Sequence, residues 1–125
     1  MEMISTLHTY WYCENQNYVV TIEDINDFLN KNKVKIRNVK LFELKKFINT
    51  NLDPKLIKES KNNLSPILVV KDLEGNYTDV IDGKHRLARA YQQGERTVRV
   101  REVCMKKAPR NMRILFLQKN YERSN

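Results

Sequence analysis

The segment Gly83–Arg86 combines a flexible backbone position with three side chains that can hold an anion. Arg86 can grip a phosphate through two parallel hydrogen bonds, and Lys84 supplies a compact positive charge. His85 can donate a hydrogen bond or carry a proton. Gly83 has no Cβ, so its backbone can adopt a left-handed conformation and a ligand can approach closely. These residue types predict a phosphate-binding segment.

Asp82 and His85 are the candidate catalytic groups, because a carboxylate and an imidazole can move a proton or position a nucleophile. Asp79, Glu59 and Glu74 are further carboxylates near the segment along the chain, and their spacing singles out no pair. The expected ligand is a nucleotide di- or triphosphate, with Mg²⁺ as a candidate companion ion. The histidines and cysteines are too far apart to predict a metal site.

The segment is predicted to lie between a strand and a helix. Residues 66–70 form a continuous apolar run, typical of a strand buried on both faces, and the turn at 72–76 predicts a partner strand over 77–81. Beyond Gly83 apolar residues recur at helical spacing, and Gly94 is placed to end that helix. The predicted buried face of the helix consists of Leu87, Ala88, Ala90 and Tyr91.

A helix that begins beside Lys84 has backbone N–H groups without intrahelical partners, and these groups favour an anion together with the helix dipole. Basic side chains in the first turn oppose that dipole, and such local conflicts are most common at functional sites. A purely structural alternative stays open: Asp82 caps the helix, Arg86 pairs with an acid and His85 packs.

The rest of the chain predicts further strands and helices, so the expected fold class is α+β. The predicted elements are a hairpin over 8–22, a helix through 25–29, a strand over 34–39, a helical turn over 41–48, a helix over 53–63, a strand over 97–103 and a basic amphipathic helix beyond Pro109. A strand over 114–117 is the alternative for the last segment. We expect one globular domain with a small mixed β-sheet and flanking helices. Its parts are an N-terminal hairpin and helix (1–33), a core (34–103) and a basic C-terminal extension (104–125).

In order and spacing, the core resembles the ParB/sulfiredoxin superfamily. The matching residues are Ser65-Pro66-Ile67-Leu68-Val69-Val70, the turn at Gly75, Ile81-Asp82-Gly83-Lys84-His85-Arg86, Ala90, Gly94 and Val98–Val103, similar to the layout QPIxV … GERRxRAA … G … VPV. The resemblance spans residues 34–103, with 53–63 as the preceding helix. It implies a ParB-like fold with Gly83, Lys84, His85 and Arg86 at phosphate-binding positions, and with Ser65 and Pro66 in a loop that borders a nucleotide.

Lys84 separates this chain from both branches of that superfamily. Sulfiredoxins carry Gly-Cys-His-Arg, so the reactive cysteine is replaced and reduction of a sulfinic acid through a thiol is not expected. ParB-type CTP-binding proteins carry Gly-Glu-Arg-Arg, so their acidic residue is replaced too. The stretch after Val103 is also too short for the helix-turn-helix DNA reader of ParB. A shorter similarity, of Asp82–Arg86 to the Asp-Gly-Gln-His-Arg signature of a domain family tied to DNA phosphorothioation, differs at Lys84 as well.

The formal net charge of +8 is concentrated in one part of the chain. Residues 1–83 hold 11 Lys and Arg against 12 Asp and Glu, whereas residues 84–125 hold 12 against 3. This asymmetry is typical of a protein with a polyanionic partner such as DNA or RNA, although a solvated basic surface has the same composition. The candidate nucleic-acid contacts are Arg89, Arg96, Arg99, Arg101, Lys106, Lys107, Arg110 and Arg113.

Three classes of function stay open at this point. The first is a ParB-like nucleotide- or phosphate-binding protein, with nucleotide hydrolysis or phosphotransfer as an additional activity. The second is a small basic nucleic-acid-binding protein or nuclease. The third is a phage-type accessory protein that acts through a protein partner. No apolar run approaches the ~20 residues of a membrane span, no leader pattern is seen and the two cysteines are isolated, so the cytoplasm is the expected compartment.

Overall fold

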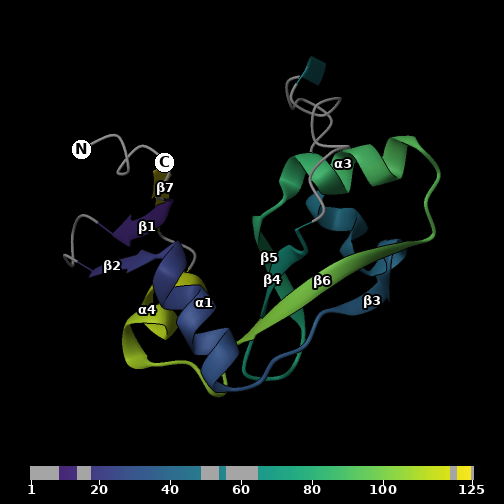
Figure 1. Cartoon of the computed structure of the whole chain (residues 1–125). Helices are drawn as coiled ribbons and strands as arrows, with labels where there is room; N and C mark the ends of the chain where they lie inside the picture. The colour runs from purple at the N-terminus through teal and green to yellow at the C-terminus, as the bar shows by residue number, and fades with distance from the viewer. Residues whose placement is uncertain (1–8, 14–17, 49–53, 56–64, 119–120, 125) are drawn as a thin grey trace. The chain divides into compact units, whose positions relative to one another are not determined.

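The computed structural model describes residues 9–13, 18–48, 54–55, 65–118 and 121–124, and its helices and strands are drawn in Figure 1. Contacts divide the chain into two units, one of Met1–Val34 with Cys104–Asn125 and the other of Lys35–Val103. Both units combine helices with a β-sheet, which confirms the α+β class. The two terminal segments thus belong to one unit, and the segment with the superfamily resemblance forms the other.

The first unit contains a sheet in which β1 (Tyr10–Cys13) lies between β2 (Tyr18–Thr21) and β7 (Glu122–Ser124). Both pairings are antiparallel, and β1 with β2 forms the predicted hairpin. The sequence did not predict β7, because Glu122–Ser124 lacks the apolar alternation of a strand. This segment is extended because its backbone pairs with β1.

Helix α1 (Ile22–Lys31) begins at a complete capping box. The Asp24 N–H donates to the Thr21 hydroxyl at 3.1 Å, and the Thr21 N–H donates to the Asp24 carboxylate at 2.9 Å. These two bonds satisfy donors that a helix start leaves without partners. The predicted apolar face is confirmed, since Ile25, Phe28 and Leu29 are buried.

Residues 110–118 form helix α4 (Arg110–Gln118) and not the alternative strand. The helix buries Met112, Leu115 and Phe116. The ring of Phe116 meets Trp11 edge-on at 5.9 Å between centroids and Tyr121 at 5.2 Å, an arrangement that aromatic rings favour. The segment is therefore a helix because this conformation buries its apolar side chains on one face. The basic side chains of Arg110 and Arg113 are exposed.

The second unit contains a sheet with the order β3-β6-β4-β5. The strands are β3 (Arg37–Lys40), β6 (Thr97–Cys104), β4 (Ile67–Lys71) and β5 (Tyr77–Asp82). β3 pairs with β6 and β4 pairs with β5, both antiparallel. The apolar strand predicted over 66–70 is confirmed as β4, whose residues 67–70 are all buried. The strand predicted over 34–39 is β3, shifted toward the C-terminus.

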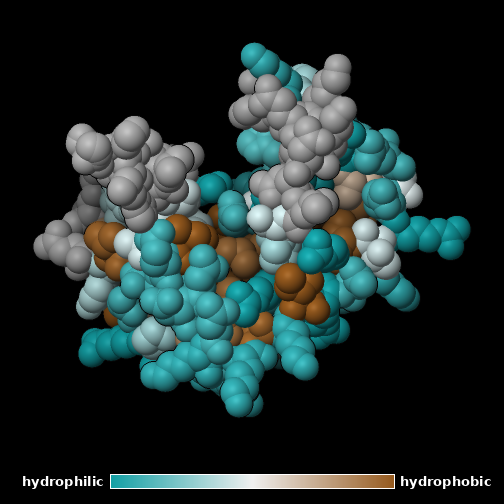
Figure 2. Space-filling model, in the orientation of Figure 1, coloured by the Kyte–Doolittle hydropathy of each residue, from teal (hydrophilic) through white to brown (hydrophobic). Residues whose placement is uncertain are grey.

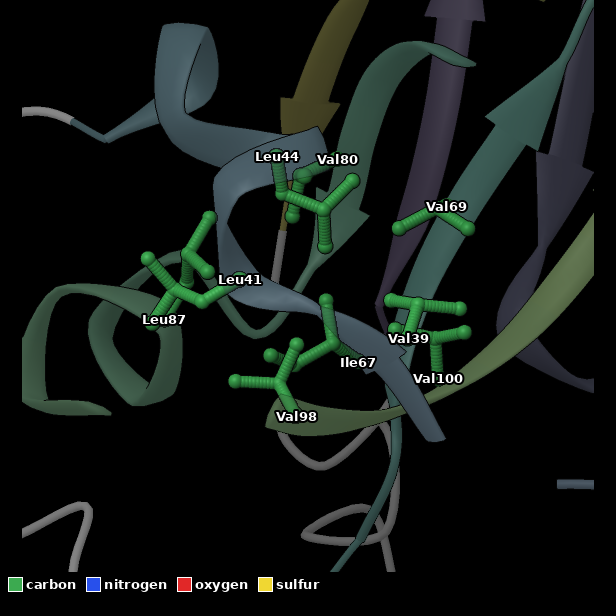
Figure 3. Close-up of a cluster of buried hydrophobic side chains, with 9 residues drawn as sticks. All are labelled: Val39, Leu41, Leu44, Ile67, Val69, Val80, Leu87, Val98 and Val100. Atoms are coloured by element: carbon green, nitrogen blue, oxygen red, sulfur yellow. The ribbon is translucent and has the colours of Figure 1, made fainter. Parts of the chain in front are cut away.

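One face of this sheet is covered by η3 (Leu41–Phe47), a 3-10 helix, and by α3 (Lys84–Gln92). Figure 3 shows Leu41 and Leu44 from η3 and Leu87 from α3 beside valine side chains of the strands. The buried cluster consists of Val39, Leu41, Leu44, Ile67, Val69, Val80, Leu87, Val98 and Val100. This cluster fixes α3 on the sheet, and with it the turn that precedes the helix.

Helix α3 ends as predicted at Gly94, which has a φ of 71°. The Gly94 N–H donates to the Tyr91 carbonyl, and the Glu95 N–H donates to the Ala90 carbonyl, the bonds of a Schellman motif. Leu87 and Ala88 are buried as expected. The prediction for Tyr91 is wrong: this residue is 47% exposed, and α3 packs on the core cluster through Leu87 and the partly buried Ala90.

The helix predicted over 53–63 lies mostly outside the described residues. Within that range the structure describes Pro54 and Lys55, and both are helical. Cys13 and Cys104 are free thiols. In the described ranges, no helix has the length and apolar character needed to cross a membrane. Hydrophilic side chains dominate the face seen in Figure 2, and hydrophobic residues reach the surface there in small groups.

Candidate functional site

The predicted phosphate-binding segment forms the turn between β5 and α3. β5 ends at Asp82, Gly83 is the N-cap residue, and α3 begins at Lys84. Gly83 has a φ of 99°, which confirms the predicted left-handed conformation. The Leu87 N–H donates to the Gly83 carbonyl at 2.9 Å and closes the first turn of the helix.

Gly83 is buried, and there is no room for a side chain at this position. A Cβ there would lie 2.8 Å from Nη2 of Arg86, 3.0 Å from Cγ1 of Ile67 and 3.2 Å from Cα of Ile67. The groups that approach the glycine are thus the chain's own strand β4 and its own arginine. Glycine is needed here both for the backbone conformation and for this close packing.

Arg86 ties the start of β4 to the end of β5. Its Nη2 donates to the Pro66 carbonyl at 3.2 Å and lies 3.5 Å from Oδ2 of Asp82. The side chain is only 14% exposed, and its Nε is buried with no hydrogen bond to the described residues. One end of the guanidinium therefore has a structural role, as the structural alternative for this turn required.

The N-cap residue of α3 is Gly83, which has no side chain that could cap the helix, and the cap by Asp82 that the alternative supposes stays a prediction. The first turn contains no acidic residue, whereas α1 has Glu23 and Asp24 in its first turn and a full capping box. The leading N–H groups of α3 therefore receive no bond from an N-cap side chain, and Lys84 and Arg86 add two positive charges beside the one negative charge of Asp82. This combination is favourable for an anion and unfavourable without one.

The remaining predicted site residues lie around this helix end. Lys84 is exposed and His85 is half-buried in the first turn of α3. Ser65 is exposed and Pro66 is half-buried directly before β4, next to the pairing of Leu68 with Asp82. The structure thus brings the residues of 65–66 and 82–86, which the sequence analysis selected, to one end of the β4–β5 pair.

The other carboxylates do not belong to this turn. Glu74 lies in the connection at the opposite end of β4 and β5, and Asp79 pairs with Val70 in the middle of β5. Glu59 lies outside the described residues. Asp82 is the carboxylate that the turn itself contains. Among the described residues, no group of three or more His, Cys, Asp or Glu side chains could hold a metal ion.

The predicted nucleic-acid contacts divide between the two units. Arg96 and Arg99 are exposed, and Arg89 and Arg101 half-buried, in the unit of residues 35–103. The other unit carries the exposed side chains of Lys106, Lys107, Arg110 and Arg113. Each unit therefore has basic side chains of its own, and a single surface made of all eight residues stays a prediction.

A polar cluster around Glu102 in β6 was not predicted from the sequence. The carboxylate of Glu102 lies 3.5 Å from Arg37 and 3.7 Å from Lys71, and it accepts a hydrogen bond from the Tyr77 hydroxyl. Burial and the neighbouring Glu102 carboxylate raise the pKa of Tyr77. The four residues come from four strands, so only the sheet order brings them together.

A hollow of about 600 Å³ lies at the C-terminal end of α3, and it too was not predicted from the sequence. Its aromatic and basic lining residues are Lys40, Phe42, Lys45, Tyr91 and Arg96. Lys40, Phe42 and Lys45 come from the part of the chain that is balanced in charge, so the concentration of basic residues after Gly83 gave no signal for them.

Comparisons with protein-family models and with curated protein sequences found no match to this chain.

Proposed function

We propose that the turn at Asp82–Arg86 binds the phosphate group of a nucleotide or of another phosphorylated ligand. The observation that carries the proposal is the start of α3, where the N-cap residue is a glycine without a side chain and where the first turn contains Lys84, His85 and Arg86 but no acidic residue. A phosphate at this position would accept hydrogen bonds from the leading N–H groups and would be attracted by the positive charge of Lys84.

The roles of the residues differ within this proposal. Lys84 is exposed and supplies charge to the ligand, and His85 supplies a hydrogen bond. Arg86 holds the loop at Pro66 and offers its remaining donors, while Gly83 allows the close packing that positions them. Ser65 and Pro66 border the ligand. The similarity of these residues to the ParB/sulfiredoxin superfamily supports a nucleotide as the ligand.

We propose binding as the primary function and phosphotransfer or hydrolysis as a secondary possibility for Asp82 and His85. A reaction needs a carboxylate free to orient a nucleophile or a metal ion. Asp82 lies 3.5 Å from Arg86, which favours a structural role for this carboxylate over that of a base. Free cysteines fit a reducing compartment, and we place the protein in the cytoplasm, where nucleotides occur.

Isothermal titration of the full chain with ATP, CTP, GTP and ADP tests the proposal, supported by mass spectrometry for nucleotide that co-purifies. We expect at least one nucleotide to bind and Lys84→Ala to weaken that binding by about tenfold, the usual effect of losing one charge-assisted contact. Lys35→Ala is the matched control, because Lys35 is also exposed but lies outside the turn. Absence of binding by all four nucleotides, or equal binding by the two variants, contradicts the proposal.

A further inference from the structure

The hollow at the C-terminal end of α3 is formed within the unit of residues 35–103. One wall is the segment of residues 40–45, where β3 continues into η3, and the other is the last turn of α3 with residues 94–97. Its volume of about 600 Å³ is in the usual size range of ligand sites. It lies at the opposite end of α3 from the Asp82–Arg86 turn.

Backbone contacts hold the two walls in place. The Leu41 N–H donates to the Arg96 carbonyl at 2.9 Å, and Lys40 pairs with Thr97 at the end of the β3–β6 ladder. Gly94, in the left-handed conformation, turns the chain from α3 toward β6. The hollow is therefore preformed, so little conformational entropy is lost when a ligand binds.

Two aromatic rings are exposed at this hollow. Phe42 is 78% exposed although its neighbours Leu41 and Leu44 in η3 are buried, and Tyr91 is 47% exposed. Exposed large aromatic side chains that share one hollow are typical of a binding surface. Their flat faces offer stacking partners to planar groups such as nucleobases.

The charges around these rings are mainly positive. The lining contains three cations, Lys40, Lys45 and Arg96, and one acidic residue, Glu95, so its formal charge is +2. In the part of the chain that the structure describes, these three cations take part in no ion pair. An anionic ligand would thus meet positive charges that no acidic side chain of the described ranges neutralises.

The same positive character continues along the sheet. Val39 and Val98 are register partners and both are buried, so their neighbours on each strand point to the opposite face. That face carries Asn38 and Lys40 from β3 with Thr97 and Arg99 from β6, all exposed. A polar and basic strip therefore leads away from the hollow along the β3–β6 pair.

We propose that the hollow and this strip bind single-stranded nucleic acid, with bases stacked on Phe42 and Tyr91 and with the phosphate backbone along Lys40, Lys45 and Arg96. A single strand presents base faces and phosphates together, as this combination of rings and cations requires. A duplex keeps its base faces stacked inside, and the Asp and Glu side chains of an acidic peptide carry no aromatic ring that could stack on Phe42 and Tyr91. The site is separate from the phosphate-binding turn and goes beyond the function proposed for it.

Fluorescence anisotropy with the full chain tests this inference, using a labelled short oligodeoxythymidylate and an abasic oligomer of the same length. We expect Phe42→Ala and Tyr91→Ala each to weaken binding of the oligodeoxythymidylate by about tenfold, the effect of losing one stacked base. Binding of the abasic oligomer should not change. Leu73→Ala is the matched control, because Leu73 is 49% exposed in the turn between β4 and β5. Phe42→Leu, which keeps the apolar bulk, should weaken binding as Phe42→Ala does.

Salt dependence tests the contribution of the cations. The slope of log affinity against log salt is negative, and Lys40→Gln and Arg96→Gln should each make it less steep by about 0.7, the value for one phosphate contact on a single strand. Lys35→Gln should leave the slope unchanged. The Lys84→Ala variant should bind the oligomer like wild type, which separates this site from the phosphate-binding turn.

Four results would overturn the inference. They are no binding of the oligodeoxythymidylate at low salt, equal affinity of wild type for the abasic oligomer, equal affinity for polyglutamate, and equal behaviour of the Phe42 and Leu73 variants. The polyglutamate result would indicate an acidic protein partner in place of a nucleic acid.

Discussion

Arg86 donates a hydrogen bond of 3.2 Å to the carbonyl oxygen of Pro66, twenty residues earlier in the chain. The same guanidinium lies 3.5 Å from the Asp82 carboxylate, so one side chain links the beginning of β4, the end of β5 and the first turn of α3. Arg86, which the sequence predicts as a phosphate ligand, therefore also connects three segments of the chain. Substitutions can separate its contribution to ligand binding from its contribution to stability.

Replacement of Arg86 should lower stability more than replacement of its neighbour. We expect Arg86→Ala to reduce the free energy of unfolding by about 1–3 kcal/mol, because the Pro66 carbonyl loses a charged donor and Asp82 loses its ion pair. Lys84→Ala, at an exposed position of the same turn, should change it by less than about 0.5 kcal/mol. Urea denaturation followed by circular dichroism measures both values. Equal effects of the two substitutions would show that the links made by Arg86 are energetically unimportant.

Two glycines with similar backbone conformations should respond differently to alanine. Gly83 and Gly75 have φ values of 99° and 87°, but a Cβ meets Arg86 and Ile67 only at Gly83, and nothing lies within 4 Å at Gly75. Backbone strain alone should cost Gly75→Ala about 1 kcal/mol, whereas the added steric overlap with Ile67 should cost Gly83→Ala about 1–3 kcal/mol more. Denaturation midpoints measured in the same buffer give the difference, and similar midpoints for the two variants would contradict the steric argument.

The hydrogen bond between Tyr77 and Glu102 should make stability depend on pH in the alkaline range. The pKa of Tyr77 is raised in the folded protein, so the folded chain keeps a proton that the unfolded chain releases above its ordinary pKa of 10.0. The stabilisation is therefore complete below pH 10 and is lost as the pH rises beyond it. Wild type should be more stable than Tyr77→Phe at neutral pH, and this difference should shrink above about pH 10.

Denaturation at a series of pH values measures this difference, with Tyr91→Phe as the control at an exposed tyrosine. A difference between wild type and Tyr77→Phe that stays constant across the alkaline range would mean that the proton on Tyr77 does not contribute as argued.

The capping box of α1 should be worth a measurable amount of stability. Thr21→Ala removes the hydroxyl that accepts from the Asp24 N–H, and we expect it to cost about 1 kcal/mol. Asn26→Ala, at an exposed position inside the same helix, should be neutral or slightly stabilising, because alanine has the higher helix propensity. Thermal or urea denaturation compares the two variants. A neutral Thr21→Ala would show that solvent satisfies the N-terminal donors of α1 equally well.

Local sequence patterns were sufficient for most elements around the candidate site. The apolar run of β4, the turn that leads to β5 and the helix end at Gly94 all agree with prediction, because each depends on residues that are neighbours in the chain. The left-handed conformation of Gly83 belongs to this group as well, since a strand-to-helix turn with a glycine has few alternatives.

Local patterns were insufficient where the partner is distant in the chain. Nothing within Glu122–Ser124 indicates a strand, and only pairing with β1 makes it β7. Tyr91 has helical spacing with the buried residues of α3, yet it is exposed, while Leu87 and Ala90 of the same helix pack on the core cluster. Each outcome depends on an element that lies far away in the sequence. The spacing of apolar residues within one element does not indicate where that distant element packs.

The residues and spacing of Asp82–Arg86 were determined by the sequence alone, and with them the chemistry that the turn can offer to an anion. Only the tertiary structure decided which of these groups are engaged with the protein itself: Arg86 contacts Pro66 and Asp82, while Lys84 stays exposed. It also placed Phe42 and Lys45 beside Tyr91 and Arg96 in one hollow. The reason is physical, because residue type and spacing fix local conformation and charge, whereas burial and side-chain partners arise when segments far apart in sequence pack together.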